Sequence, residues 1–314
     1  MNMPSNLNVD EQRRTPIFSI VIPTYNRGHI LSRAIQSDLN QTFCDFELII
    51  VDDGSTDNSQ ELVEQITDPR ILYLRQENQG VSTARNAGFK VSKGKYITFL
   101  DSDDEALPEW LHCLVTAFTT ETVGAVCAGV KVSDAKENKI VVRLPSNRDP
   151  MYDDQTCLFL SGTFAVRRDV FEAVGGYAES LAYGENSELG LRIVSHCTQK
   201  NLPIANVAEP LVIYHRQPLR WAKSEDKFRL RLASAEYVLR QHGERYRKKH
   251  PRGYTNYCAI AGVNAARLGM HQQARQFFMS AIHVYPWDWR HYCRFVLTLI
   301  PSLGRNFWLR YQQE

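Results

Sequence analysis

The amino-acid sequence predicts an α/β protein built on a mostly parallel sheet with helices on both faces. Apolar runs of strand length alternate with segments of helical periodicity through the first half of the chain. Strands separated by helices of this length are typical of parallel βαβ units. In addition, two of the apolar runs lead directly into clusters of carboxylates. Ligands of such sheets bind beyond the carboxyl ends of the strands, so we expect both clusters at one functional edge.

The strands are expected where β-branched and apolar residues run together between turn-forming residues. The first run, residues 18–22, is expected to stop at Pro23. After residue 139 the alternating pattern weakens, and the later strands are predicted from shorter runs. The remaining predicted strands are residues 46–51, 71–74, 96–100, 123–132, 159–166 and 211–214.

Helices are expected where apolar residues recur every three or four positions. Asp57 stands three residues before Gln60, a spacing typical of a helix start. Pro108 fits the first turn of another helix. From about residue 221 onward only helices are expected. Before that point, the predicted helices are residues 29–39, 57–66, 81–91, 108–118 and 186–195.

Length and composition indicate a globular protein with room for two units. The chain has 314 residues, 43% of them hydrophobic and 23% charged, which is ordinary for a folded protein. The pattern predicts a flexible segment at 1–16, an α/β domain at 17–220 and a helical extension at 221–314. It offers no apolar run of spanning length, no signal peptide and no CxxC pair among its seven cysteines. We therefore expect a cytoplasmic protein with reduced thiols.

The two carboxylate clusters are the strongest pointers to function. Asp101-Ser102-Asp103-Asp104 follows one predicted strand, and Asp52-Asp53-Gly54-Ser55 follows another. Three carboxylates within four residues repel one another unless a cation lies between them. The sequence therefore predicts a crevice that holds a metal ion together with a ligand of that metal.

The C-terminal third leaves two interpretations open for each of its features. Residues 216–252 contain twelve Lys or Arg and four Asp or Glu, which suits either an anionic partner or a solvated helix face. Residues 285–311 combine aromatic residues with four arginines, which suits either contact with a membrane surface or the packing of the last helices. Small residues between 258 and 286 have the offsets of one tetratricopeptide repeat, or they belong to a simple helical hairpin.

Four segments together resemble the family 2 glycosyltransferases, which have the GT-A fold. They are SIVIPTYN at 19–26, VDDGSTD at 51–57, NQGVSTARNAG at 78–88 and FLDSDD at 99–104, and the resemblance covers about residues 17–220. It implies a metal-dependent enzyme that moves a sugar from a nucleotide-sugar donor to a hydroxyl of a saccharide, lipid or protein, with inversion, in cell-surface glycan synthesis. The tail would then be a helical extension with one tetratricopeptide-like unit.

The resemblance also implies roles for individual residues. A UDP-sugar is the favoured donor, and Mn²⁺ or Mg²⁺ the favoured metal, since hard cations prefer carboxylate oxygens. No nucleic acid is expected as a partner, and the enzyme is expected in the cytoplasm or at the inner face of the membrane, held by its C-terminal helices. The metal ligands would be Asp101, Asp103 and His215. The donor would contact Pro23, Thr24, Tyr25, Asp53, Arg85, Asp101 and Ser102.

The general base is the point at which this chain departs from the family pattern. Asn186 stands where family members often carry an acidic residue, and an amide cannot accept a proton at neutral pH. Three interpretations follow. Glu185 or Glu188 is the base, with Glu185 favoured; the enzyme works by another mechanism, such as retention; or the domain is a catalytically impaired nucleotide-sugar-binding scaffold that uses its helical tail to bind a partner.

Overall fold

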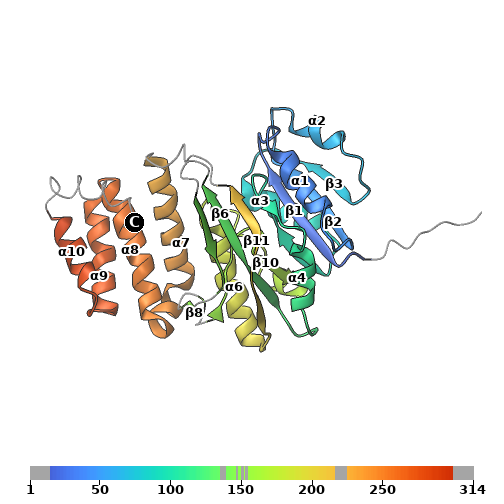
Figure 1. Ribbon diagram of the computed structural model, residues 1–314. Helices are drawn as coiled ribbons and strands as arrows, with labels where there is room; N and C mark the ends of the chain where they lie inside the picture. Colours follow the sequence, from blue (N-terminus) through green and yellow to red (C-terminus); the bar gives the residue numbers. More distant parts are fainter. Residues whose placement is uncertain are drawn as a thin grey trace, which may run out of the picture.

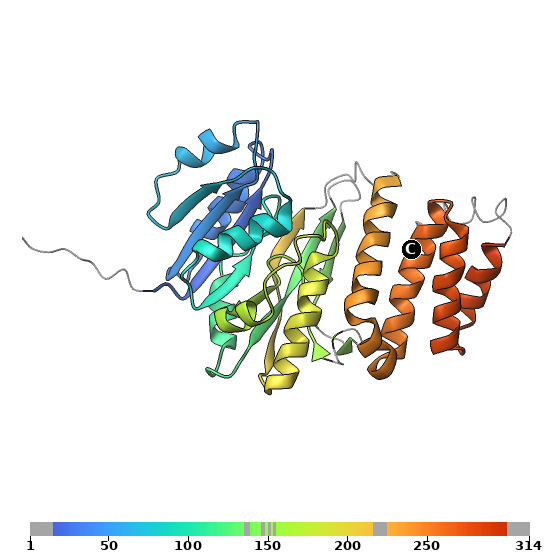
Figure 2. The same cartoon turned by 180° about the vertical axis from the view of Figure 1, so that it is seen from behind.

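The computed structural model describes residues 15–134, 139–145, 148–149, 152, 155–215 and 225–299. A large sheet with its helices forms one end of the molecule, and a row of helices forms the other end (Figures 1 and 2). Nearly all of the predicted flexible segment 1–16 lies outside the described residues, as does the predicted boundary between residues 220 and 221.

The sheet begins with the parallel half that the sequence predicts. From the edge inward, β3 pairs with β2, β2 with β1 and β1 with β4, all in parallel. The carboxyl ends of β1, β2 and β4 therefore meet at one edge of the sheet. These strands are β1 (Phe18–Thr24), β2 (Phe46–Asp52), β3 (Ile71–Arg75) and β4 (Tyr96–Phe99).

The other half of the sheet is mixed. β10 runs antiparallel to both β4 and β6, β11 runs parallel to β6, and β5 and β7 add antiparallel edges. A separate two-stranded sheet joins β8 (Arg148–Asp149) to β9 (Gln155–Thr156). The strands of the mixed half are β5 (Glu105–Ala106), β6 (Ala125–Asp134), β7 (Lys139–Arg143), β10 (Phe164–Arg167) and β11 (Ile204–His215).

Helices cover both faces of the sheet, so the predicted α/β class is confirmed. Successive side chains of a strand point to opposite faces. In β1, Ile20 and Ile22 accordingly belong to a core cluster with α1 and α4, whereas Val21 belongs to a second cluster with α3 and α6. The helices of this unit are α1 (Leu31–Leu39), α2 (Ser59–Glu64), α3 (Val81–Val91), α4 (Trp110–Ala117), α5 (Arg168–Ala173) and α6 (Glu185–Lys200).

Several strand boundaries differ from the prediction for local reasons. β1 continues through Pro23 to Thr24, because its pairing with β4 ends at Val21 and no donor is needed from Pro23 on that side. β11 has twelve residues instead of the predicted four, since a register shift around Pro210 breaks its pattern. β10 starts only at Phe164, after the left-handed turn at Gly162. β7 was not predicted, and all five of its residues are exposed.

The C-terminal helices lie side by side in both views (Figures 1 and 2). The core cluster on the α3 and α6 face continues through α7 and α8 to Phe278 of α9. At Gly262 an added Cβ would lie 2.6 Å from the Phe278 ring, so the small residue permits close helix approach. It stays a prediction that α8 and α9 form one tetratricopeptide unit. These helices are α7 (Glu225–Lys249), α8 (Pro251–Arg267), α9 (His271–Val284) and α10 (Trp289–Leu297).

No helix of the described ranges combines the length and the apolar composition that crossing a bilayer demands.

Candidate functional site

A pocket of about 380 Å³ opens at the carboxyl ends of β1, β2 and β4. Its volume falls within the usual range for small-molecule sites. All seven residues predicted to bind the donor line it, together with Asp103 and Glu185, whereas Glu188 and His215 do not. The lining residues are Pro23, Thr24, Tyr25, Arg27, Asp53, Val81, Ala84, Arg85, Asp101, Ser102, Asp103 and Glu185.

Asp53 organises one wall of the pocket. One carboxylate oxygen accepts hydrogen bonds from Gln76 Nε2 at 2.7 Å and from the Gln79 amide at 2.9 Å. The other accepts from the Gly80 amide at 2.8 Å. A carboxylate has about four lone-pair sites, so these bonds leave about one for a ligand. Asp53 thus fixes the loop before α3 and retains limited capacity to accept from a bound base.

The end of β1 and the residue after it line the pocket beside Asp53, whose backbone amide donates to the Thr24 carbonyl at 2.8 Å. Tyr25 is 47% exposed, which leaves a ring face available for stacking. Thr24 is buried, and its hydroxyl has no hydrogen-bond partner among the described residues. A buried hydroxyl without a partner is costly. A polar ligand in the pocket could satisfy it.

Asp101, Asp103 and Asp104 form the acidic cluster that the sequence predicts. Each offers a carboxylate oxygen, and these three atoms lie within 4.8 Å of one another. Burial, together with the charges of Asp101 and Asp103, raises the pKa of Asp104 to about 9. Burial and Asp101 likewise raise the pKa of Asp103, against the opposing charges of Arg27 and Arg33.

The cluster fits a hard divalent cation. Its donors are all carboxylate oxygens, the type that Mg²⁺ and Mn²⁺ prefer. Burial, and after it the charges of the neighbouring carboxylates, raise these pKa values, and a bound cation would favour the ionised form against both effects. Asp101 and Asp103 also line the pocket, so a cation held there would face a bound ligand.

His215 is not brought into this cluster by its side chain. Its Nε2 lies 3.2 Å from Glu105 Oε2, and its backbone amide donates to Asp104 Oδ1 at 3.2 Å. The residue therefore supports the acidic segment from β11 through its main chain. Asp104 takes the third position in the cluster, which the prediction had given to His215.

Arg85 of α3 joins two carboxylates at the back of the pocket. Its guanidinium donates to Asp101 Oδ1 at 2.7 Å and to Glu185 Oε1 at 2.9 Å. The arginine side chain is only 1% exposed, and its carbon Cζ lies 5.0 Å from the centre of the Tyr177 ring. Although burial alone lowers it, the adjacent Tyr177 and the carboxylates of Asp101 and Glu185 raise the pKa of Arg85, so it stays cationic. Its contact with the donor stays a prediction; in this structure its forked donors bind these two acids.

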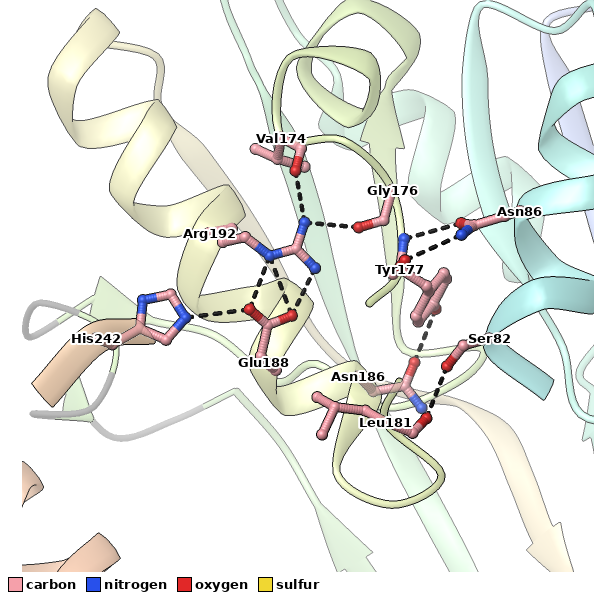
Figure 3. Close-up of polar contacts among 10 residues, drawn as sticks. All are labelled: Ser82, Asn86, Val174, Gly176, Tyr177, Leu181, Asn186, Glu188, Arg192 and His242. Atoms are coloured by element: carbon pink, nitrogen blue, oxygen red, sulfur yellow. Dashed lines mark hydrogen bonds and ion pairs between the residues drawn. The ribbon is translucent and has the colours of Figure 1, made fainter. Parts of the chain in front are cut away.

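Glu185 and Glu188 stand at the start of α6 in different surroundings. Glu185 lines the pocket with its side chain 14% exposed. Glu188 is buried, and it accepts from Arg192 Nε at 2.8 Å and from His242 Nε2 at 3.1 Å (Figure 3). Burial by itself raises the pKa of Glu188, but the bonds from His242 and Arg192 outweigh it and lower that pKa. Of the two candidate bases, the pocket thus contains Glu185.

Three pocket residues were not predicted. Arg27 Nη2 lies 3.7 Å from Asp103 Oδ2, and Val81 and Ala84 come from the first turns of α3. Arg27 directly follows the first matching segment, a signal that could have found it. Tyr177 lies behind Arg85 on an irregular segment, and nothing in its sequence surroundings indicates that position.

The protein is therefore an α/β protein with a pocket at the carboxyl edge of its sheet, beside a cluster of carboxylates that suits a divalent cation. The chain belongs to glycosyl transferase family 2, whose family model matches residues 19–175. The family named from the sequence motifs is thereby confirmed.

Individual relatives agree with this assignment. An uncharacterized glycosyltransferase of Nostoc is 41% identical over 125 residues, which cover 39% of this chain and 39% of the relative. The chain therefore spans less than half the length of that curated relative.

Two solved structures share the fold. The structure of Staphylococcus aureus TarS 1-349 in complex with UDP-GlcNAc has a TM-score of 0.63 and 16% identity, covering 94% of this chain and 90% of that one. The mannosyltransferase PcManGT of Pyrobaculum calidifontis, in complex with GDP-Man and Mn²⁺, has a TM-score of 0.57 and 15% identity. The match covers 96% of this chain and 89% of the PcManGT chain.

Proposed function

We propose that this chain is a metal-dependent glycosyltransferase that moves a sugar from a nucleotide-sugar donor to an acceptor hydroxyl with inversion. The observation that carries the proposal is the pocket in which Asp53, the Asp101–Asp103 pair and Glu185 face one cavity. Asp53 suits contact with a nucleoside, the Asp101–Asp103 pair suits a metal-bound diphosphate, and Glu185 at the start of α6 suits the role of proton acceptor.

The donor side is the better supported half. Asp53, Thr24 and Tyr25 would contact the nucleoside, and Pro23 and Ser102 would complete its wall. Asp101 and Asp103, with Asp104 behind them, would hold Mn²⁺ or Mg²⁺. The bound cation would supply Lewis-acid neutralisation of the charge that develops on the leaving diphosphate. Arg27 and the Arg85 guanidinium add positive charge on the same side.

Glu185 is the proposed general base. It would take the proton of the acceptor hydroxyl while the acceptor oxygen bonds to the anomeric carbon. The bond from that carbon to the diphosphate breaks, and the nucleoside diphosphate leaves with the electron pair. Attack from the side opposite the leaving group inverts the configuration at that carbon. Within the described chain, Glu185 Oε2 has no hydrogen-bond partner, which supports this role.

The finer assignments are supported by the family and by two structures of similar fold. TarS was solved with UDP-GlcNAc and PcManGT with GDP-Man and Mn²⁺. We favour a UDP-sugar as donor and a glycan, glycolipid or glycoprotein of the cell surface as acceptor, with residues 17–220 as the catalytic unit. Large aromatic side chains at the start of α10 are exposed, with Trp287 at 82% and Trp289 at 70%. They support contact with a membrane surface.

A second candidate function is a nucleotide-sugar-binding scaffold without transfer activity. Asn186 favours it, because the amide stands where family members carry an acid. A scaffold would bind a nucleotide sugar and release no nucleotide. A transferase would bind the nucleotide sugar and release the nucleoside diphosphate.

The decisive experiment is a donor panel. Purified protein is incubated with UDP- and GDP-sugars, Mn²⁺ and a mixture of glycan acceptors, and the released nucleoside diphosphate is measured. We expect release with one donor, and we expect Asp103→Ala to abolish it while the melting temperature stays within a few degrees. Asp169→Ala, which removes an exposed carboxylate outside the pocket, is the matched control. Unchanged turnover by Asp103→Ala would contradict the metal assignment.

A further inference from the structure

Asn186 lies in a chain of polar contacts that ends on Glu185. The Tyr177 hydroxyl and Asn186 Oδ1 are 2.8 Å apart (Figure 3), and Asn186 Nδ2 is 3.2 Å from Glu185 Oε1. The same Glu185 oxygen accepts from Arg85. Two donors therefore converge on one oxygen of the proposed base.

The direction of these bonds follows from the chemistry of the partners. A carboxylate oxygen only accepts, so it requires the NH₂ group of the amide on its side. The amide oxygen then faces Tyr177, which must donate. Burial, partly offset by Arg85, raises the pKa of Tyr177, so its hydroxyl keeps the proton that it donates. An inverted amide would place two acceptor oxygens against each other at Glu185.

Tyr177 is itself held from two elements. Asn86 of α3 accepts from the Tyr177 amide at 2.8 Å and donates to the Tyr177 carbonyl at 2.9 Å (Figure 3). Arg192 of α6 donates to the carbonyls of Val174 and Gly176, at 2.6 Å each. The Tyr177 ring packs against Phe99 with centroids 5.0 Å apart. The hydroxyl therefore meets Asn186 at a place fixed by the surrounding structure.

We propose that Asn186 and Tyr177 are positioning residues for Glu185, which turn its Oε1 toward Arg85 and leave Oε2 to meet the acceptor hydroxyl. The inference rests on the proposed function of Glu185 as the base. Asn186 is then not the remnant of a lost base. Its amide performs a task that a carboxylate cannot, because a carboxylate has no N–H to donate.

The positioning role and the loss of a base predict opposite changes in turnover for Asn186→Asp. If Asn186 has replaced a lost base, Asn186→Asp restores an acceptor and raises turnover. If Asn186 positions Glu185, the same change removes a donor and sets a second negative charge beside the base. We then expect the kcat of Asn186→Asp to fall tenfold or more, on the scale of a lost hydrogen bond to a charged group.

The experiment compares kcat and KM for Asn186→Asp, Tyr177→Phe and Glu185→Gln, using the donor that the panel identifies. Tyr177→Phe removes only the hydroxyl and keeps the ring beside Arg85, and we expect its kcat to fall about fivefold, as for one neutral hydrogen bond. Melting temperature and affinity for UDP and GDP are expected to stay near the wild-type values. Tyr285→Phe, which removes a hydroxyl bonded to Arg252 in the extension, serves as control.

The outcomes separate the two levels of inference. Wild-type turnover that is abolished in Glu185→Gln but unchanged or raised in Asn186→Asp would overturn the positioning role and leave the proposed function standing. An unchanged kcat in Tyr177→Phe would show that the Tyr177 hydroxyl does not help to position Glu185. Transfer that is equal in wild type and Glu185→Gln, or absent from both, would overturn the base assignment on which the positioning role depends.

Discussion

Arg85 and Asp101 form an ion pair at 2.7 Å in which the arginine is 1% exposed and the aspartate side chain 33% exposed. The buried partner is thus anchored in α3, while the carboxylate remains accessible from the pocket. Through Nη1, Arg85 also donates to Glu185 Oε1 at 2.9 Å. One guanidinium therefore sets the spacing between the acidic cluster and the proposed base.

Arg85→Lys keeps the positive charge but loses the planar fork that serves two acids at once. We expect kcat to fall about ten- to hundredfold, because the loss of one hydrogen bond between charged groups costs roughly 1.5–3 kcal/mol. Steady-state nucleotide release measures the effect. Arg70 forms an ion pair with Asp68 and does not line the pocket, so Arg70→Lys should leave kcat unchanged. A similar kcat for both variants would argue against the bridge.

Metal binding should stabilise the fold. A ligand that binds only the native state raises the melting temperature. We expect Mn²⁺ to raise it in the wild type, because a cation relieves the repulsion among Asp101, Asp103 and Asp104, and we expect chelation by EDTA to reverse the shift. In Asp103→Asn the shift should largely disappear. An equal rise in wild type and variant would indicate that Mn²⁺ binds elsewhere.

Glu188 predicts how stability depends on pH. Its bonds with His242 and Arg192 lower its pKa below the ordinary 4.5. A depressed carboxyl pKa contributes stability that is complete above the unfolded-state value and is lost as the pH falls through the folded-state value. The wild type should therefore lose more unfolding free energy than Glu188→Gln between about pH 5 and pH 3. Urea titrations at both pH values, with the exposed Glu77→Gln as control, measure this difference.

Gly88 tests the packing of α3 against the sheet. An added Cβ would lie 2.5 Å from Val21 Cγ1 and 3.0 Å from Val51 Cγ2. We expect Gly88→Ala to lower the unfolding free energy by about 1–3 kcal/mol through overpacking. Gly243→Ala in α7 has its nearest neighbour at 3.6 Å and should instead stabilise by about 0.5–1 kcal/mol. Chemical denaturation of both variants checks the opposite signs.

The exposed aromatic residues beside α10 predict membrane binding. Trp287→Ala with Trp289→Ala should reduce co-flotation with vesicles that contain phosphatidylglycerol, since aromatic side chains at the interface anchor peripheral proteins. The double variant Ile140→Ala and Val142→Ala removes exposed apolar side chains from β7 and serves as control. If neither the wild type nor the variants float with the vesicles, the membrane proposal is wrong.

The sequence by itself determined the parallel half of the fold and the residues of the proposed donor side. Strands 18–22, 46–51 and 96–100 are apolar and β-branched, so their period and length were readable locally, and the residues that follow them carry the chemistry. Asp53, Asp101 and Asp103 line one pocket because the carboxyl ends of parallel strands meet at one edge.

Only the tertiary structure decided the mixed half of the sheet and the surroundings of the proposed base. The length of β11 depends on a register shift that leaves no local pattern, and the exposed β7 forms by pairing with β6. Glu185 and Glu188 are both acids at the start of one helix, and only long-range contacts distinguish them: Arg85 and the pocket for the first, His242 of α7 for the second. Such contacts join residues 54 to 100 positions apart, a separation that local propensity does not encode.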